Sequence, residues 1–111
     1  MSYDYFLFAK PAEGDLTLDA IAAAQRPIAD PDAILRTISE QFPQVRWEAV
    51  TQVPGAWSGV LGPPEFIVTP ESDGRVMAVK ATRIEADEVR DLARALACVV
   101  FDPQRGGFLD V

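Results

Sequence analysis

Two dense apolar runs, residues 3–9 (YDYFLFA) and 98–101 (CVVF), constrain the fold of this chain more than any other feature. From Tyr5 to Phe8 the apolar side chains run together without polar alternation, which predicts a strand covered on both faces, near the middle of a sheet. Pro11 ends this strand because proline cannot donate to a strand ladder. The second run has the same character, so we expect it to lie beside the first.

Three segments have the residue patterns of helices. Residues 16–25 (LTLDAIAAAQ) place apolar residues at helical spacing on a thin alanine face, and Pro27 ends this helix. In the next segment, Asp30 fits the N-cap and Pro31 fits the first helical position. Pro43 ends this second helix because it biases the preceding residue away from helical geometry.

The third helix has the clearest signals. The stretch from Thr82 to Glu85 (TRIE) matches the capping box Thr-x-x-Glu and predicts that Thr82 caps the helix. An apolar stripe follows, with acids towards the N-terminal end and arginines towards the C-terminal end, as the helix macrodipole favours. This helix should lead directly into strand 98–101.

The middle of the chain, residues 45–81, has strand patterns. VRWEAV alternates polar and apolar residues, and WSGVLG at 57–62 fits a short, glycine-weakened strand. Strands at 65–69 and 76–81 flank the turn ESDGR, which predicts a hairpin.

The predicted element order is β-α-α-β-β-β-β-α-β-β in a single globular domain, residues 1–111. Helices at two places around a strand-rich middle favour an α+β fold. We expect two layers, with the helices packed on one face of a mostly antiparallel sheet.

Net charge limits the classes of partner. The formal net charge is −7, which argues against nucleic-acid binding, because phosphate contacts require clustered lysine and arginine. The same charge disfavours an anionic membrane surface. It is compatible with a basic protein partner. No oligomeric state follows from it.

The residue types present also limit the chemistry. The chain has no histidine, which removes the commonest general base and most types of zinc site. Its one cysteine, Cys98, follows a helix C-terminus, so we expect a buried, unreactive thiol. A single cysteine and the lack of a basic leader before Asp4 predict a cytoplasmic protein. No catalytic residue, cofactor or metal site is predicted.

Acidic residues form the most conspicuous charged cluster. Asp87 and Asp91 stand within i,i+3 reach of Arg90 and Arg94, as on a solvated helix face. Asp30 and the acid two residues on are already explained by helix capping. A surface of acids such as Asp87 and Asp91 is nevertheless a candidate contact for a basic partner.

Two further residues are candidates for a partner surface. Trp57 lies in the Pro/Gly-rich stretch VPGAWSGVLGPP, where an aromatic side chain is either a binding anchor or a lid on the core. Trp47, within an alternating strand, is more typical of the core. FDPQRGG predicts a turn that starts at Asp102 and joins strands 98–102 and 107–111. Arg105 is then exposed at its tip.

The two ends of the chain, MSYDYFLF at 1–8 and VVFDPQ at 99–104, resemble small bacterial proteins of uncharacterised function. Those proteins begin with Met-Ser-Tyr-Asp before an aromatic strand, and end with a helix that leads into a Val-Val-(Phe/Tyr)-Asp-Pro-Gln strand. Some of them are similar to immunity proteins that neutralise toxins exchanged between bacteria. The resemblance implies an α+β fold and a protein-binding role, and it assigns no functional residue.

The sequence leaves three functions open. The first is a non-enzymatic interaction protein of the inhibitor or immunity kind, steered to its partner by its acidity. The second is a small ligand-binding domain or carboxylate-based enzyme, with a pocket near the 51–64 loop. The third is a homo-oligomeric structural domain that pairs through an edge strand such as 107–111.

Overall fold

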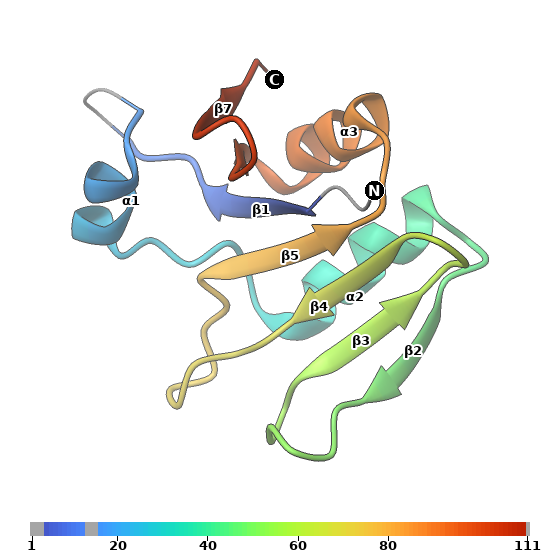
Figure 1. Cartoon of the computed structure of the whole chain (residues 1–111). Helices are drawn as coiled ribbons and strands as arrows, with labels where there is room; N and C mark the ends of the chain where they lie inside the picture. The colour runs from blue at the N-terminus through green and yellow to red at the C-terminus, as the bar shows by residue number, and fades with distance from the viewer. Residues whose placement is uncertain (1–3, 13–15, 111) are drawn as a thin grey trace.

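The structure, a computed structural model, describes residues 4–12 and 16–110 and has the element order that the sequence predicts (Figure 1). The elements are β1 (Asp4–Ala9), α1 (Leu18–Ala24), α2 (Pro31–Gln41), β2 (Arg46–Ala49), β3 (Trp57–Val60), β4 (Glu65–Val68), β5 (Ala78–Thr82), α3 (Ala86–Leu96), β6 (Cys98–Asp102) and β7 (Gly107–Leu109). Among the described residues, no helix has the length and apolar character that crossing a bilayer requires.

One antiparallel sheet of seven strands organises the fold, in the order β2-β3-β4-β5-β1-β6-β7. β1 lies inside the sheet between β5 and β6, and pairs Leu7 with Val79 on one side and with Val100 on the other. The predicted adjacency of the two apolar runs is therefore confirmed, as are the two hairpins that join β4 to β5 and β6 to β7.

Helices α2 and α3 pack together on one face of this sheet, which confirms the two-layer α+β class (Figure 1). The core between the layers contains fully buried side chains from both: Leu7, Ile34, Ile38, Phe66, Val68, Val79, Val89, Leu92 and Val100. Phe42, just after α2, packs its ring 5.2 Å from that of Phe66. We call this side of the sheet the covered face.

β1 is covered fully on one face only, so the prediction of a strand covered on both faces is wrong. Tyr5 and Leu7 are buried, whereas Phe6 and Phe8 are half-buried on the opposite face. All four are apolar, so their chemistry does not reveal the period of two that strand geometry imposes.

α1 stands apart from α2 and α3 (Figure 1). Thr17 caps it, accepting a hydrogen bond from the Ala20 N–H at 3.0 Å. Gln25 ends it in the left-handed conformation, two residues before the predicted stop at Pro27. The seven residues of this helix include none that is buried, because its alanine-rich face gives the core little to pack against.

The N-cap of α3 is Glu85, not Thr82 as the capping-box pattern predicts. The Glu85 N–H donates to the Glu88 carboxylate at 3.4 Å, so a box formed three residues later begins the helix. Thr82 instead ends β5, where it pairs with Asp4 of β1 and Glu65 of β4. Pairing with two neighbouring strands thus overrides the local helix signal.

The other local predictions for helix ends and turns are confirmed. Asp30 caps α2 by accepting from the Ala33 N–H at 2.9 Å, and Pro31 is the first helical residue. In the turn after β6, the buried Asp102 carboxylate accepts from the Gln104 N–H at 3.0 Å. Gly106 then takes a φ of 67°, which glycine adopts without steric cost, and the chain returns as β7.

Candidate functional site

The face of the sheet opposite α2 and α3 is the most distinctive surface of the described molecule. One row of register-paired residues crosses it from edge to edge: Glu48, Ser58, Ile67, Lys80, Phe6, Phe101 and Phe108. Of the six phenylalanines of the chain, Phe42 and Phe66 are in the core, and the other four lie on this side. We call Phe6, Phe8, Ile67, Lys80, Phe101 and Phe108 the aromatic face.

Contacts between neighbouring side chains hold the aromatic face in place. Phe6 and Phe8 stack with ring centroids 6.5 Å apart, two positions along the same strand. Phe101 and Phe108 meet edge to face across the β6–β7 hairpin at 5.2 Å. Lys80 on β5 places its Nζ 6.0 Å from the centroid of the Phe6 ring, within cation–π range. These rings are half-buried by one another and stay accessible from outside.

Three hollows mark this side of the sheet. The first, of about 310 Å³, is lined by Phe6, Ile67, Thr69, Glu71, Met77, Ala78 and Lys80. The second, of about 290 Å³, lies between the sheet and α1 and is lined by Phe8, Leu18, Ile21, Ala22, Arg26 and Met77. The third and largest is about 560 Å³, lined by Leu16, Thr17, Leu18, Asp19, Phe101, Gly106, Gly107, Phe108, Leu109 and Asp110. We call this third hollow the hairpin groove.

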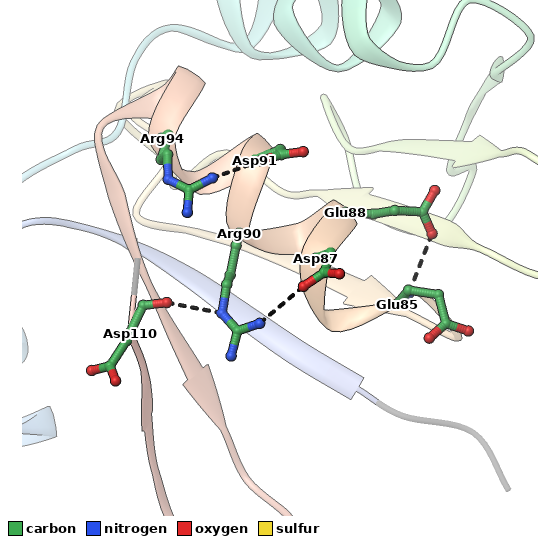
Figure 2. Close-up of polar contacts among 7 residues, drawn as sticks. All are labelled: Glu85, Asp87, Glu88, Arg90, Asp91, Arg94 and Asp110. Atoms are coloured by element: carbon green, nitrogen blue, oxygen red, sulfur yellow. Dashed lines mark hydrogen bonds and ion pairs between the residues drawn. The ribbon is translucent and has the colours of Figure 1, made fainter.

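The exposed acidic residues Asp87 and Asp91 of α3 line none of these hollows. Figure 2 shows Asp87 bound to Arg90 and Asp91 bound to Arg94, at 3.2 and 2.6 Å, as the i,i+3 spacing predicts. Arg90 does more than pair with Asp87, because its Nε also donates to the backbone carbonyl of Asp110 at 2.9 Å. This bond fastens the chain after β7 to α3.

No hydrogen bond or ion pair among the described residues joins Trp57 or Arg105 to that acidic surface. Trp57 is the first residue of β3 and pairs with the buried Val68, so it points to the covered side, where it is half-buried. It lines none of the three hollows. Arg105 is exposed at the tip of the β6–β7 hairpin, as the turn pattern predicts. Of the four predicted partner-surface residues, Trp57 thus lies on the covered side of the sheet, and Arg105 lies at a hairpin tip.

The remaining predicted features contribute to the fold. Trp47 packs over Gly59 and donates from Nε1 to the Ser39 hydroxyl at 2.9 Å, tying β2 to α2. Cys98 is buried, and desolvation raises the pKa of its thiol from 9.0 to about 12, so it stays protonated at neutral pH. The described residues contain no group of three or more histidine, cysteine, aspartate or glutamate side chains placed to hold a metal ion.

Sequence reasoning missed the aromatic face, although a signal for it exists. Phe6 and Phe8 are two residues apart, and the predicted turn at 102–107 sets Phe101 opposite Phe108. With strand 3–9 placed beside strand 98–101, these side chains fall on one side of the sheet. The information that only two helices cover the opposite side comes from the structure alone.

No protein-family model matches the chain, and neither curated proteins nor solved structures yield a match. Near the two ends of the chain, the described residues 6–8 lie beside residues 99–101, since β1 pairs with β6. With its amide nitrogen turned towards Asp102, Gln104 also donates to the Asp102 carboxylate and to the Asp4 carbonyl, at 2.7 and 3.2 Å. These contacts tie the turn after β6 to the start of β1.

Proposed function

We propose that the chain is a non-enzymatic protein-binding module, of the inhibitor or immunity kind, that docks its aromatic face on a basic protein partner. The observation that carries the proposal is the set of four half-buried phenylalanines on the side opposite α2 and α3. Aromatic side chains are enriched in protein interfaces, and they provide most of the binding energy where they cluster.

The arrangement of the aromatic face favours a macromolecular partner. Its row of paired residues runs across seven strands spaced about 4.8 Å apart, which is much wider than one small molecule. A contiguous apolar surface on a small domain is costly to leave in water and commonly marks an interface. Cross-strand contacts preorganise these rings, which lowers the entropy cost of binding.

Charge supports a basic partner. The net charge of −7 repels acidic macromolecules and steers basic ones, which raises the association rate at low salt. Glu48 ends the row of paired residues at the β2 edge, and the exposed Glu71 lines the first hollow together with Phe6 and with Lys80, the one cation of the row. Apolar contact then contributes most of the binding free energy, whereas charge raises the association rate and favours basic partners over acidic ones.

The test compares two forms of the protein as baits. Phe6→Thr/Ile67→Thr removes apolar side chains from the middle of the aromatic face while keeping strand-favouring residues. Val53→Thr changes an exposed apolar residue in the loop before β3 and serves as the matched control. Proteins from an extract of the encoding organism are captured on each bait, and a retained protein is purified and titrated against each form.

The proposal predicts a basic protein that binds the wild-type and Val53→Thr forms alike and binds Phe6→Thr/Ile67→Thr at least about tenfold more weakly. Equal binding by all three forms would overturn the role of the aromatic face. Light scattering on the purified protein measures whether the chain associates with itself. A dimer that dissociates in Phe6→Thr/Ile67→Thr would assign this face to a second copy of the chain and refute the proposed function.

A further inference from the structure

We propose that the hairpin groove receives a basic side chain, arginine above all, from the partner that docks on the neighbouring aromatic face. The groove lies between the start of α1 and the β6–β7 hairpin, and Phe101 and Phe108 belong to both surfaces. This inference rests on the proposed function and specifies the chemistry of its partner.

Part of the groove wall is apolar and accessible. Only three large hydrophobic side chains of the described residues are exposed, and two of them, Leu16 and Leu18, line it at 40% and 44% exposure. Opposite them stands the edge-to-face pair of Phe101 and Phe108. The resulting slot of about 560 Å³ is large enough for a long side chain with part of its backbone.

Two acidic residues line the same groove, Asp19 in the first turn of α1 and Asp110 after β7. Neither forms an ion pair with any residue that the structure describes. Arg90 binds the backbone carbonyl of Asp110, and Figure 2 shows the Asp110 carboxylate pointing away from that guanidinium. Arg90 thus holds the backbone of Asp110 but forms no ion pair with its carboxylate.

A groove that combines apolar side chains, aromatic rings and unpaired acidic residues complements an arginine side chain, which has an apolar stem and a cationic head. The three methylene groups of arginine pack against apolar surface, as they do when long basic side chains lie along a protein. Its guanidinium stacks on aromatic faces and binds carboxylates through paired hydrogen bonds. The aromatic face already contains one contact between a cation and an aromatic ring, since the Lys80 Nζ lies over the Phe6 ring.

An anionic group fits the groove poorly. α1 is only seven residues long, and Thr17 already accepts from one of its first N–H groups. Asp19 stands in the same first turn and repels negative charge. The electrostatics of the groove therefore select a cation.

A defined probe tests the proposal on the full chain. The tripeptide N-acetyl-glycyl-arginyl-glycine amide is titrated into isotopically labelled protein and followed by NMR, beside the same peptide with citrulline, a neutral isostere of arginine. We expect saturable shifts at the amides of Gly106, Gly107 and Asp110 with the arginine peptide, and shifts at least about fivefold weaker in apparent affinity with citrulline. Equal responses to both peptides would overturn the proposal.

Two variants with the same change of net charge separate the groove from general acidity. Asp19→Asn/Asp110→Asn removes the carboxylates of the groove, and Asp32→Asn/Glu40→Gln removes two exposed acids on α2, which line none of the hollows. The first should weaken binding of the arginine peptide about fivefold, and the second should change it less than about twofold. Equal weakening by both would show that net charge alone attracts the peptide, against a specific groove.

Failure of this inference is distinguishable from failure of the proposed function. If the captured partner binds Asp19→Asn/Asp110→Asn as tightly as wild type but loses affinity for Phe6→Thr/Ile67→Thr, the aromatic face is correct and the groove proposal is wrong. If the arginine peptide binds the groove but no partner depends on Phe6 and Ile67, the proposed docking face is wrong.

Discussion

The two faces of the sheet are built from the same strands, yet they differ in what covers them. Leu7 and Val100 point to the covered face and are fully buried under α2 and α3, while Phe6 and Phe101, one residue away on the same strands, are half-buried on the other side. The covered face therefore stabilises the fold, and the aromatic face holds apolar area that folding does not bury. This difference makes the second face a candidate for binding.

Phenylalanine substitutions on the two faces should give the largest contrast. Phe66→Ala in the core leaves a cavity and should lower the free energy of unfolding by about 3–5 kcal/mol. Phe6→Thr removes cross-strand contacts from a half-buried site and should cost about 1 kcal/mol or less. Urea denaturation followed by circular dichroism measures both. Similar losses for the two variants would break the comparison, because they would make the aromatic face part of the core.

The β6–β7 turn sharpens the comparison between buried and exposed positions. Asp102→Ala removes the buried carboxylate that accepts from the N–H of the exposed Gln104 and should cost about 1 kcal/mol. Arg105→Ala, at the exposed tip of the same turn, should change the free energy of unfolding by less than about 0.5 kcal/mol. Urea denaturation of both variants checks the expectation, and a larger loss for Arg105→Ala would contradict it.

Burial of Cys98 on the covered side should make the stability of the fold depend on pH. Its thiol has a pKa of about 12 in the folded protein and 9.0 as the ordinary value, so the folded state resists its ionisation. Ionisation of the thiol leaves stability unchanged well below pH 9, and the free energy of unfolding falls as pH rises through 9 towards 12, because the unfolded chain releases the proton first. At about pH 9.5 the loss should be about 1 kcal/mol, and Cys98→Ala should remove it.

Labelling with a thiol reagent gives an independent check on the same residue. At pH 7.5 the native protein should react far more slowly than the urea-unfolded chain, in which the thiol is accessible and its pKa is ordinary. Equal rates in the two states would contradict the burial of Cys98.

The ion pairs of α3 should give the smallest effects. Asp91→Asn removes one exposed i,i+3 pair and should cost about 0.2–0.5 kcal/mol. Arg90→Met should cost more, about 1 kcal/mol, since it also loses the hydrogen bond that holds the Asp110 carbonyl. Denaturation in low and high salt checks the assignment, because only the ion-pair part should decrease with salt.

Local chemistry in the sequence predicts much of the fold. Asp30 and Pro31 specify the start of α2 because the cap and the fixed φ act within one turn. Asp102 and Gly106 do the same for the last hairpin. These signals involve neighbours in the chain, so one sequence is enough to interpret them.

The errors arise where distant parts of the chain decide. Thr82 matches the pattern of a helix N-cap. In the structure it belongs to β5, where it pairs with β1 and β4, and Glu85 is the N-cap of α3. Phe6 appears covered because apolar residues flank it on both sides in the sequence. Phe6 is only half-buried because α2 and α3 both pack on the opposite face of the sheet. The local sequence pattern does not predict which face a helix packs on.

The central claim is that the aromatic face is the docking surface, and NMR cross-saturation tests it most directly. Saturation transferred from the captured partner to deuterated protein marks the residues in contact. The account predicts the strongest losses of signal at the amides around Phe6, Ile67, Phe101 and Phe108. Losses confined to the α3 surface around Asp87 and Asp91, or to the neighbourhood of Trp57, would contradict it.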